Sequence, residues 1–287
     1  MIREDGADTV MVEMYRFLLA PKWIGFHLLV VVGIVAMVNF GFWQLRRLDD
    51  KQAFNARVEQ RYDAAVVPLD ELLMPGANPD DVEWRPVSVS GVYEPAGTVQ
   101  IVNRSQFGQA GGNTVTPMRL ESGQVLLVNR GFLPLDVVAS LPPVGTVSVT
   151  GRLRLTQVRT FAQLGDPADG VLTVAQRVDV NRLAQQIDGD VLPMYLDVYE
   201  SNPIEAEPRP QPVVAPELSE GNHLSYAVQW FVFAVAVAVG WILAVRRSQR
   251  TRQHQREAPS DTTADTATET SASSSEEPVR PRRYTDQ

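Results

Sequence analysis

The sequence predicts two transmembrane α-helices flanking an extracytoplasmic α+β domain, mostly antiparallel β, with a small barrel-like sheet. Three features support this fold: two apolar runs near the ends of the chain, short β-rich segments between them, and arginines after the second run. The predicted order is a cytoplasmic N-terminus (1–22), a first span (23–45), an extracytoplasmic domain (46–223), a second span (224–245) and a cytoplasmic tail (246–287).

The first apolar run, Trp23 to Leu45, contains 23 residues. At 1.5 Å per helical residue it is long enough to cross a hydrocarbon core of roughly 30 Å. No small-residue cleavage site follows it, which favours an uncleaved anchor over a signal peptide. The preceding residues include Glu4, Asp5 and Asp8, whereas a mitochondrial presequence is poor in acids. A bacterial plasma membrane is therefore the expected location.

The second run, Leu224 to Val245, contains 22 residues, and the stretch from Arg246 to Arg256 carries five arginines and no acid. The positive-inside rule places this flank in the cytoplasm. With two spans, both termini are then cytoplasmic and the domain lies outside. The basic residues after the first span favour the opposite orientation, but their asymmetry is smaller. In the tail, the segment Asp261–Pro278 is rich in Ser, Thr, Ala and acids, which predicts disorder.

The middle segment has the residue pattern of a β-rich domain. The charged stretch Asp49–Asp63 predicts a helix that continues out of the first span, and Val178–Ile187 predicts another helix, with Asp179 as its N-cap. The glycine run Gly108–Asn113 is typical of a loop. Short alternating segments separated by turn residues predict a small antiparallel sheet or barrel. The predicted strands are Val87–Tyr93, Thr98–Val102, Val115–Leu120, Gln124–Arg130, Val147–Leu155 and Met194–Tyr199.

Composition excludes several classes of function. The chain has no cysteine, which rules out disulfides, thiolate metal sites and thiol catalysis. The net charge is −8, and the excess acid lies in the middle segment, which argues against nucleic acid as a partner. No Walker loop, GxGxxG, HExxH or GxSxG motif is present. The sequence therefore predicts that the protein is not an enzyme.

Three histidines are the candidate metal ligands. His254 lies in the basic tail, while His27 and His223 flank the two spans. His27 lies about 27 Å along a helix from the outer end of the first span, so the two imidazoles cannot bind one iron within a monomer. For His223 two interpretations stay open: a helix cap together with Asn222, or a metal ligand.

Arginines and aromatic residues also have two interpretations each. Arginine forks bind carboxylates, including haem propionates, but strand-end arginines can equally pair with the domain's own acids. Aromatic residues near the span ends are typical of an interfacial belt. The arginines are Arg85, Arg104, Arg119 and Arg130, and the aromatic residues are Trp23, Trp43, Tyr226, Trp230 and Trp241.

Four segments, taken in order, resemble the surfeit locus protein 1 family of cytochrome c oxidase assembly factors. FGFWQLRRLDDK is similar to the family's G-x-W-Q-x-x-R element, and WRPVSVSGVY is similar to its R-x-V-x-x-x-G strand. NRSQFGQAGGNTVTPMRL with LLVNRGFLP resembles the R…G…TP…R-G-W-x-P region, with Phe132 in place of the common Trp. GNHLSYAVQWFVFA resembles N-H-x-x-Y-A-x-x-W-F-x-x-A. A second departure is Asp50, where the family often has Trp before the lysine.

The resemblance implies assembly work: promoting insertion of haem A into the large subunit of the oxidase, with haem A bound transiently. His223 matches the histidine implicated in haem binding. Tyr226 and Trp230 lie three and seven residues further on and share its helix face, so they can flank a porphyrin, while Arg104 or Arg130 can pair with a propionate. The expected partners are the large oxidase subunit, a haem A synthase and the lipid bilayer.

Two alternatives stay open. The protein could be a structural or accessory subunit of a respiratory complex, without cofactor contact. It could also be a two-span sensor, although the acidic tail contains no signalling domain, which weakens that interpretation.

Overall fold

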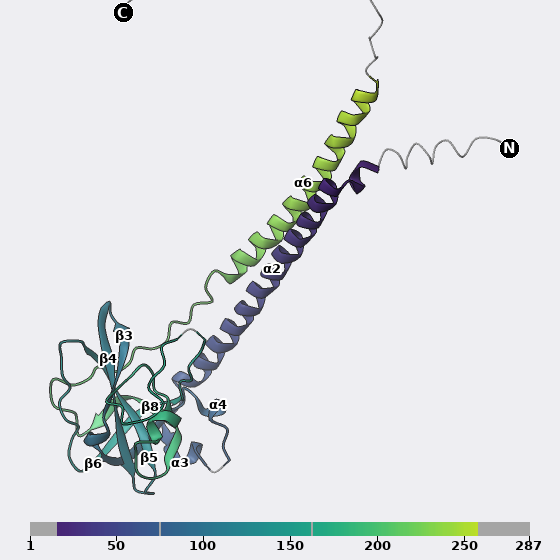
Figure 1. Cartoon of the computed structure of the whole chain (residues 1–287). Coiled ribbons are helices and arrows are strands. Elements are labelled where there is room, and N and C mark those ends of the chain that lie inside the picture. Colours follow the sequence, from purple (N-terminus) through teal and green to yellow (C-terminus); the bar gives the residue numbers. More distant parts are fainter. Residues whose placement is uncertain (1–15, 75, 162, 258–287) are drawn as a thin grey trace, which may run out of the picture. The chain divides into compact units, whose positions relative to one another are not determined.

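The computed structural model describes residues 16–74, 76–161 and 163–257 (Figure 1). Most of the predicted N-terminal segment and the predicted disordered tail from residue 258 onward lie outside the described residues. The helices are η1 (Arg16–Leu19), α2 (Pro21–Tyr62), α3 (Leu69–Leu72), α4 (Pro79–Val82), η2 (Pro95–Gly97), α5 (Val180–Ala184) and α6 (His223–Glu257). The strands are β1 (Val67–Pro68), β2 (Pro86–Tyr93), β3 (Val99–Gln106), β4 (Gln109–Leu120), β5 (Val125–Pro134), β6 (Thr146–Leu155), β7 (Val174–Ala175) and β8 (Val191–Asn202).

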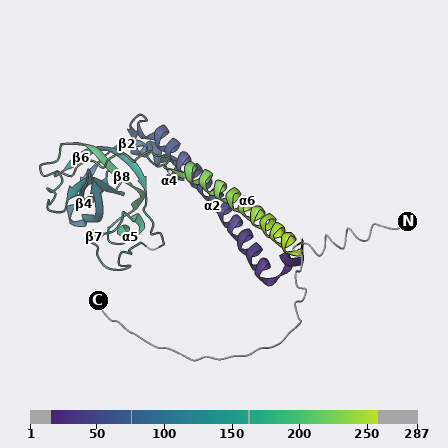
Figure 2. The ribbon, with the colours of Figure 1, turned by 90° about the horizontal axis from the view of Figure 1, so that it is seen from above.

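The chain divides into two compact units. The helical unit comprises residues up to Val38 and from Phe231 onward, and the sheet unit comprises Asn39–Trp230. In the helical unit, parts of α2 and α6 lie side by side (Figures 1 and 2). The sheet unit holds the remainder of both helices and all the strands.

The two long helices match the two predicted spans. Both are long and apolar enough to cross a membrane, which is consistent with a membrane-anchored protein. Apolar side chains such as Leu28, Leu29 and Val32 are exposed on α2, as expected for a surface that faces lipid. The same helix continues without a break through the charged stretch to Tyr62, which confirms the predicted extension.

One mixed sheet of eight strands forms the core of the sheet unit, in the order β1-β2-β6-β8-β5-β4-β3-β7. Most neighbours are antiparallel, as predicted, but β1–β2, β3–β7 and β5–β8 are parallel. The predicted barrel is wrong. Strand β8 inserts between β6 and β5 instead of pairing with its sequence neighbours, and the two-residue strands β1 and β7 stand at the two ends of the strand order. A short ladder also joins β2 to β4.

All six predicted strands are present, several of them longer than expected. The loop predicted for Gly108–Asn113 is wrong, because β4 already begins at Gln109 and only the tight turn at Phe107–Gly108 separates it from β3. Close packing explains these strand glycines: a Cβ on Gly111 would collide with the Leu133 carbonyl oxygen of β5. The position needs a glycine because another backbone passes close by.

Central strand β5 is buried on both faces, which explains its nearly continuous apolar sequence. Leu126 and Val128 belong to one hydrophobic cluster and Leu127 to the other. The second cluster includes residues of β7 and α5, which lie near each other in Figure 2. Helix α5 is shorter than predicted, but its N-cap is confirmed, since the Asp179 side chain accepts the N–H of Arg182.

The end of α2 is fastened to the sheet by Arg152 of β6. Its guanidinium lies 3.5 Å from the ring centroid of Tyr62 and 4.6 Å from that of Tyr199. Its Nε also donates a hydrogen bond of 2.9 Å to the Tyr62 carbonyl oxygen. These contacts hold the last turn of α2 against the sheet.

Candidate functional site

His223 is the first residue of α6 and is half-buried. Its Nδ1 lies 2.8 Å from the side-chain carbonyl oxygen of Gln44 on α2. An amide oxygen can only accept a hydrogen bond, so Nδ1 carries the proton and donates it. A neutral imidazole in this tautomer keeps its lone pair on Nε2.

The imidazole does not cap its own helix. Its bonded nitrogen is directed to α2, and the first turn of α6 uses the Asn222 carbonyl oxygen, which accepts the N–H of Tyr226. Within the described part of the chain, Nε2 of His223 has no hydrogen-bond partner. That nitrogen is therefore available to a metal.

Gly221 lies next to this nitrogen. A Cβ at Gly221 would stand 3.6 Å from both Nε2 and Cδ2 of His223. The glycine also has φ +67°, a conformation that other residues rarely adopt. The available lone pair on Nε2 is the feature of this site that can bind a metal.

A second contact between α2 and α6 lies close to this one. The rings of Phe40 and Trp230 have centroids 5.0 Å apart and are tilted by 34°. Phe40 precedes Gln44 by one helical turn, while Trp230 follows His223 by two, so the helices run antiparallel here. Tyr226, between them on α6, is half-exposed. His223, Tyr226 and Trp230 lie in the first turns of α6.

The other histidines have different surroundings. In the helical unit, the indole N–H of Trp241 donates to Nδ1 of His27 at 2.8 Å. Since indole nitrogen can only donate, the neutral imidazole of His27 carries its proton on Nε2, the reverse of His223. His254 is exposed. No group of three or more His, Cys, Asp or Glu side chains forms a metal site in residues 16–74, 76–161 and 163–257.

Arg104 on β3 has its hydrogen-bond partners within the domain. Its guanidinium donates to the Gln157 side chain and to the Gln176 carbonyl oxygen, each at 3.2 Å. It also lines a cavity of about 460 Å³ together with Arg177.

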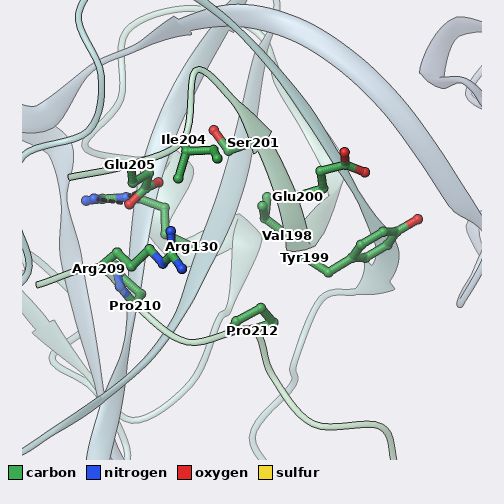
Figure 3. Close-up of a pocket in the computed structure, with 10 residues that line it drawn as sticks. All are labelled: Arg130, Val198, Tyr199, Glu200, Ser201, Ile204, Glu205, Arg209, Pro210 and Pro212. Carbon is green, nitrogen blue, oxygen red and sulfur yellow. Dashed lines mark hydrogen bonds and ion pairs between the residues drawn. The ribbon is translucent and has the colours of Figure 1, made fainter. Parts of the chain in front are cut away.

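Arg130 on β5 forms a buried ion pair with Glu205 (Figure 3). The two side chains are 2% and 8% exposed, and their closest atoms are 2.6 Å apart. A further bond of 2.8 Å joins the guanidinium to the Ser140 carbonyl oxygen. A propionate would have to displace Glu205 to reach this guanidinium. The other interpretation, pairing with one of the domain's own acids, describes the contact that is present.

The arginine and Glu205 line a cavity of about 300 Å³. The ring of Tyr93 lies 6.0 Å from the guanidinium of Arg130. Burial raises the pKa of the Tyr93 hydroxyl above its ordinary value, Glu205 raises it further, and Arg130 opposes both. The hydroxyl therefore stays neutral beside the ion pair.

The two residues after Arg130 also contact the connector between β8 and α6. Gly131 has φ +128°, and a Cβ there would collide with the Gln211 carbonyl oxygen. Phe132 pairs with Gln211 through two backbone hydrogen bonds of 2.7 and 2.8 Å. Gly131 therefore lies within β5 and not at its end. It lets the connector approach the middle of β5.

Sequence comparison places these features in a family. The model of the SURF1 family matches residues 31–235, which is most of the chain. The chain belongs to the SURF1 family. SURF1 proteins are generally known as cytochrome oxidase assembly factors, so the resemblance derived from the four segments is confirmed.

Relatives occur in bacteria and animals. An uncharacterised SURF1-like protein of Mycobacterium tuberculosis is 28% identical over 234 residues, which cover 78% of this chain and 83% of that protein. A SURF1-like protein of Rickettsia felis is 22% identical, covering 76% and 95% of the two chains. One from Caenorhabditis elegans is 24% identical, covering 79% and 76%.

The family match separates the three histidines. His223 is the single histidine within residues 31–235, because His27 precedes that range and His254 follows it. The SURF1 region also includes Gln44, whose contact with His223 the sequence did not predict. The sequence feature that could have indicated this contact is the strongly polar side chain of Gln44 near the end of an apolar run.

Proposed function

We propose that this SURF1 protein is a membrane-anchored assembly factor for a haem-copper cytochrome c oxidase that promotes haem A insertion into the large subunit. It acts as a chaperone and not as an enzyme. The observation that carries the proposal is the availability of Nε2 on His223, the one histidine of the SURF1 region.

Haem A is the cargo in this proposal. Nε2 of His223 provides one axial ligand to the iron, and a single ligand suits transient binding, because the other axial position stays open for exchange. The exposed ring of Tyr226 provides aromatic surface for the porphyrin, and Trp230 lies one turn further along. Arg104 remains the propionate partner in the proposal, since Arg130 already pairs with Glu205.

The membrane arrangement is part of the proposal. The five arginines after the second span place both termini in the cytoplasm of a bacterial cell, with the sheet domain outside the plasma membrane. His223 then lies at the outer end of its span. An apolar macrocycle favours the hydrocarbon edge there, while its propionates favour the wet interface. The large oxidase subunit and a haem A synthase are the proposed partners.

Co-expression with a haem A synthase tests the cargo. The purified protein should carry haem A, seen in its absorption spectrum, and His223→Ala should remove most of it. The matched controls are His27→Ala and His254→Ala, which each remove an imidazole outside the SURF1 region and should retain the haem. Wild-type haem content and spectrum in the His223→Ala protein would refute the ligand assignment.

Stoichiometry tests the assembly role. A chaperone should be substoichiometric in purified mature oxidase, and its deletion should lower the haem a content of that oxidase. An equimolar amount in the mature complex would instead identify an accessory subunit and contradict the proposal.

A further inference from the structure

We propose that Gln44 is a positioning residue for His223: by accepting the Nδ1 proton, it fixes the tautomer and ring orientation that direct the Nε2 lone pair outward. The inference rests on the proposed function for the identity of the metal ligand. It goes beyond that function by naming Gln44 of α2 as the residue that orients the His223 ring before haem binds.

The hydrogen bond itself supports this role. Nδ1 of His223 and the amide oxygen of Gln44 are 2.8 Å apart, an ordinary distance for a well-formed hydrogen bond. Because an amide oxygen can only accept, the imidazole must be the donor. Histidines that bind metals usually donate their second ring N–H to a carbonyl or carboxylate oxygen, which orients the ring and raises its basicity. Gln44 provides that oxygen.

The packing of the two helices holds Gln44 in place. The contact between Phe40 and Trp230 fixes the register of α2 against α6 one turn away. Gly41 and Ala227 are buried in the same part of the sheet unit, and small residues of this kind allow helices to approach closely. A rotation of α2 would move Gln44 away from the imidazole, so the bond depends on this packing.

His27 provides an internal comparison. Its Nδ1 accepts the indole N–H of Trp241, so its neutral form carries the proton on Nε2. The same type of side chain is thus held in opposite tautomers by an acceptor in one place and a donor in the other. The choice of partner, glutamine or tryptophan, decides which nitrogen is free.

Haem-free protein gives the first test. In detergent-solubilised full-length protein with ¹⁵N-labelled histidine, long-range proton–nitrogen spectra distinguish the two tautomers, and His223→Ala and His27→Ala spectra assign the signals. We expect His223 to be protonated on Nδ1 and His27 on Nε2. Gln44→Leu, similar in size but without an acceptor, should abolish the preference at His223 only. Gln44→Glu, which keeps an acceptor, should retain it.

Haem A titration gives the second test. Gln44→Leu should weaken binding roughly tenfold or more, because loss of such a supporting residue typically weakens metal affinity 10- to 100-fold. Gln44→Glu should restore affinity and lower the midpoint potential of the bound iron, since a carboxylate increases the basicity of the imidazole. A merely structural role for Gln44 would not shift the potential in the glutamate variant.

The outcomes separate the two proposals. An unchanged His223 tautomer in Gln44→Leu, or wild-type haem affinity in that variant, overturns the role of Gln44 and leaves the haem proposal standing. The expected tautomers in a protein that binds no haem A, even as wild type, overturn the haem proposal instead.

Discussion

Replacing Arg130 with alanine should destabilise the sheet unit whether or not haem is bound. The guanidinium donates to both oxygens of Glu205, at 2.9 and 2.6 Å, and to the Ser140 carbonyl oxygen. Both charged side chains are almost fully buried. Removing one partner of such a pair costs about 3–5 kcal/mol, because the remaining charge stays buried without compensation. For a domain of this size, each kcal/mol lowers Tm by about 2–4 °C, so a decrease of about 6–20 °C is expected.

The assay is thermal unfolding of the purified full-length protein in detergent, followed by circular dichroism without haem. The double variant Arg130→Met with Glu205→Leu should recover much of the loss, because it leaves no buried charge. Arg209→Ala is the matched control: Arg209 lines the same cavity, but it is half-exposed and its ion pair is with exposed Glu207. Such a surface pair is worth at most about 1 kcal/mol. A loss that appears only in haem-loaded protein would refute this reasoning and identify Arg130 as a propionate partner.

Two further predictions concern topology and the attachment of α2. Reporter fusions after Ser260 and at Gly108, in the exposed turn between β3 and β4, should give opposite compartment signals, and a cytoplasmic signal from Gly108 would contradict the proposed orientation. Arg152→Leu should lower the free energy of unfolding by about 2 kcal/mol, because it removes two ring contacts and a hydrogen bond. Arg152→Lys should recover part of this loss, and equal Tm values for the wild type and the leucine variant would contradict the prediction.

Local patterns predicted the elements of this fold better than their arrangement. Short β-branched segments between turn residues identified six strands, and several of them also alternate with period two, because their side chains alternate across the pleat. The parallel pairing of β5 with β8 joins segments about 66 residues apart, for example Val125 with Val191, and no local signal encodes such a pairing. Strands of two residues, such as β1 and β7, are too short to show any periodicity.

The same limit applies to the candidate site. His223 could be predicted as a candidate ligand because it is a single imidazole at the start of a span. The resemblance of GNHLSYAVQWFVFA to the family motif supported the same prediction. Its partner Gln44 is 179 residues away in sequence, so the contact depends on how α2 and α6 pack. For Arg130, the sequence left two pairing partners open: an acidic residue of the domain itself or a haem propionate. The acid is Glu205, in a proline-rich connector where no sequence pattern marks an ion pair.

Arg130, Gly131 and Phe132 have one structural feature in common, which is contact with the connector that leads from β8 to His223. The register of β4 and β5 shifts at this point, so that Arg130 has no residue opposite it on β4, and such a bulge redirects a side chain. Arg130 then binds Glu205, while Phe132 pairs with Gln211. The arginine-glycine pair of the motif thus anchors the connector, independently of any haem contact.

Gly131→Ala separates these two roles of the motif. The new methyl group would meet the Gln211 carbonyl oxygen, and φ +128° strains any residue with a side chain, so the connector should detach from β5. Glycine has no side chain with which to bind a propionate. If the motif acts by anchoring, Gly131→Ala should lower Tm and haem A content together, and Arg130→Ala should have the same two effects. If Arg130 instead binds haem directly, Gly131→Ala should retain the haem content of the wild type.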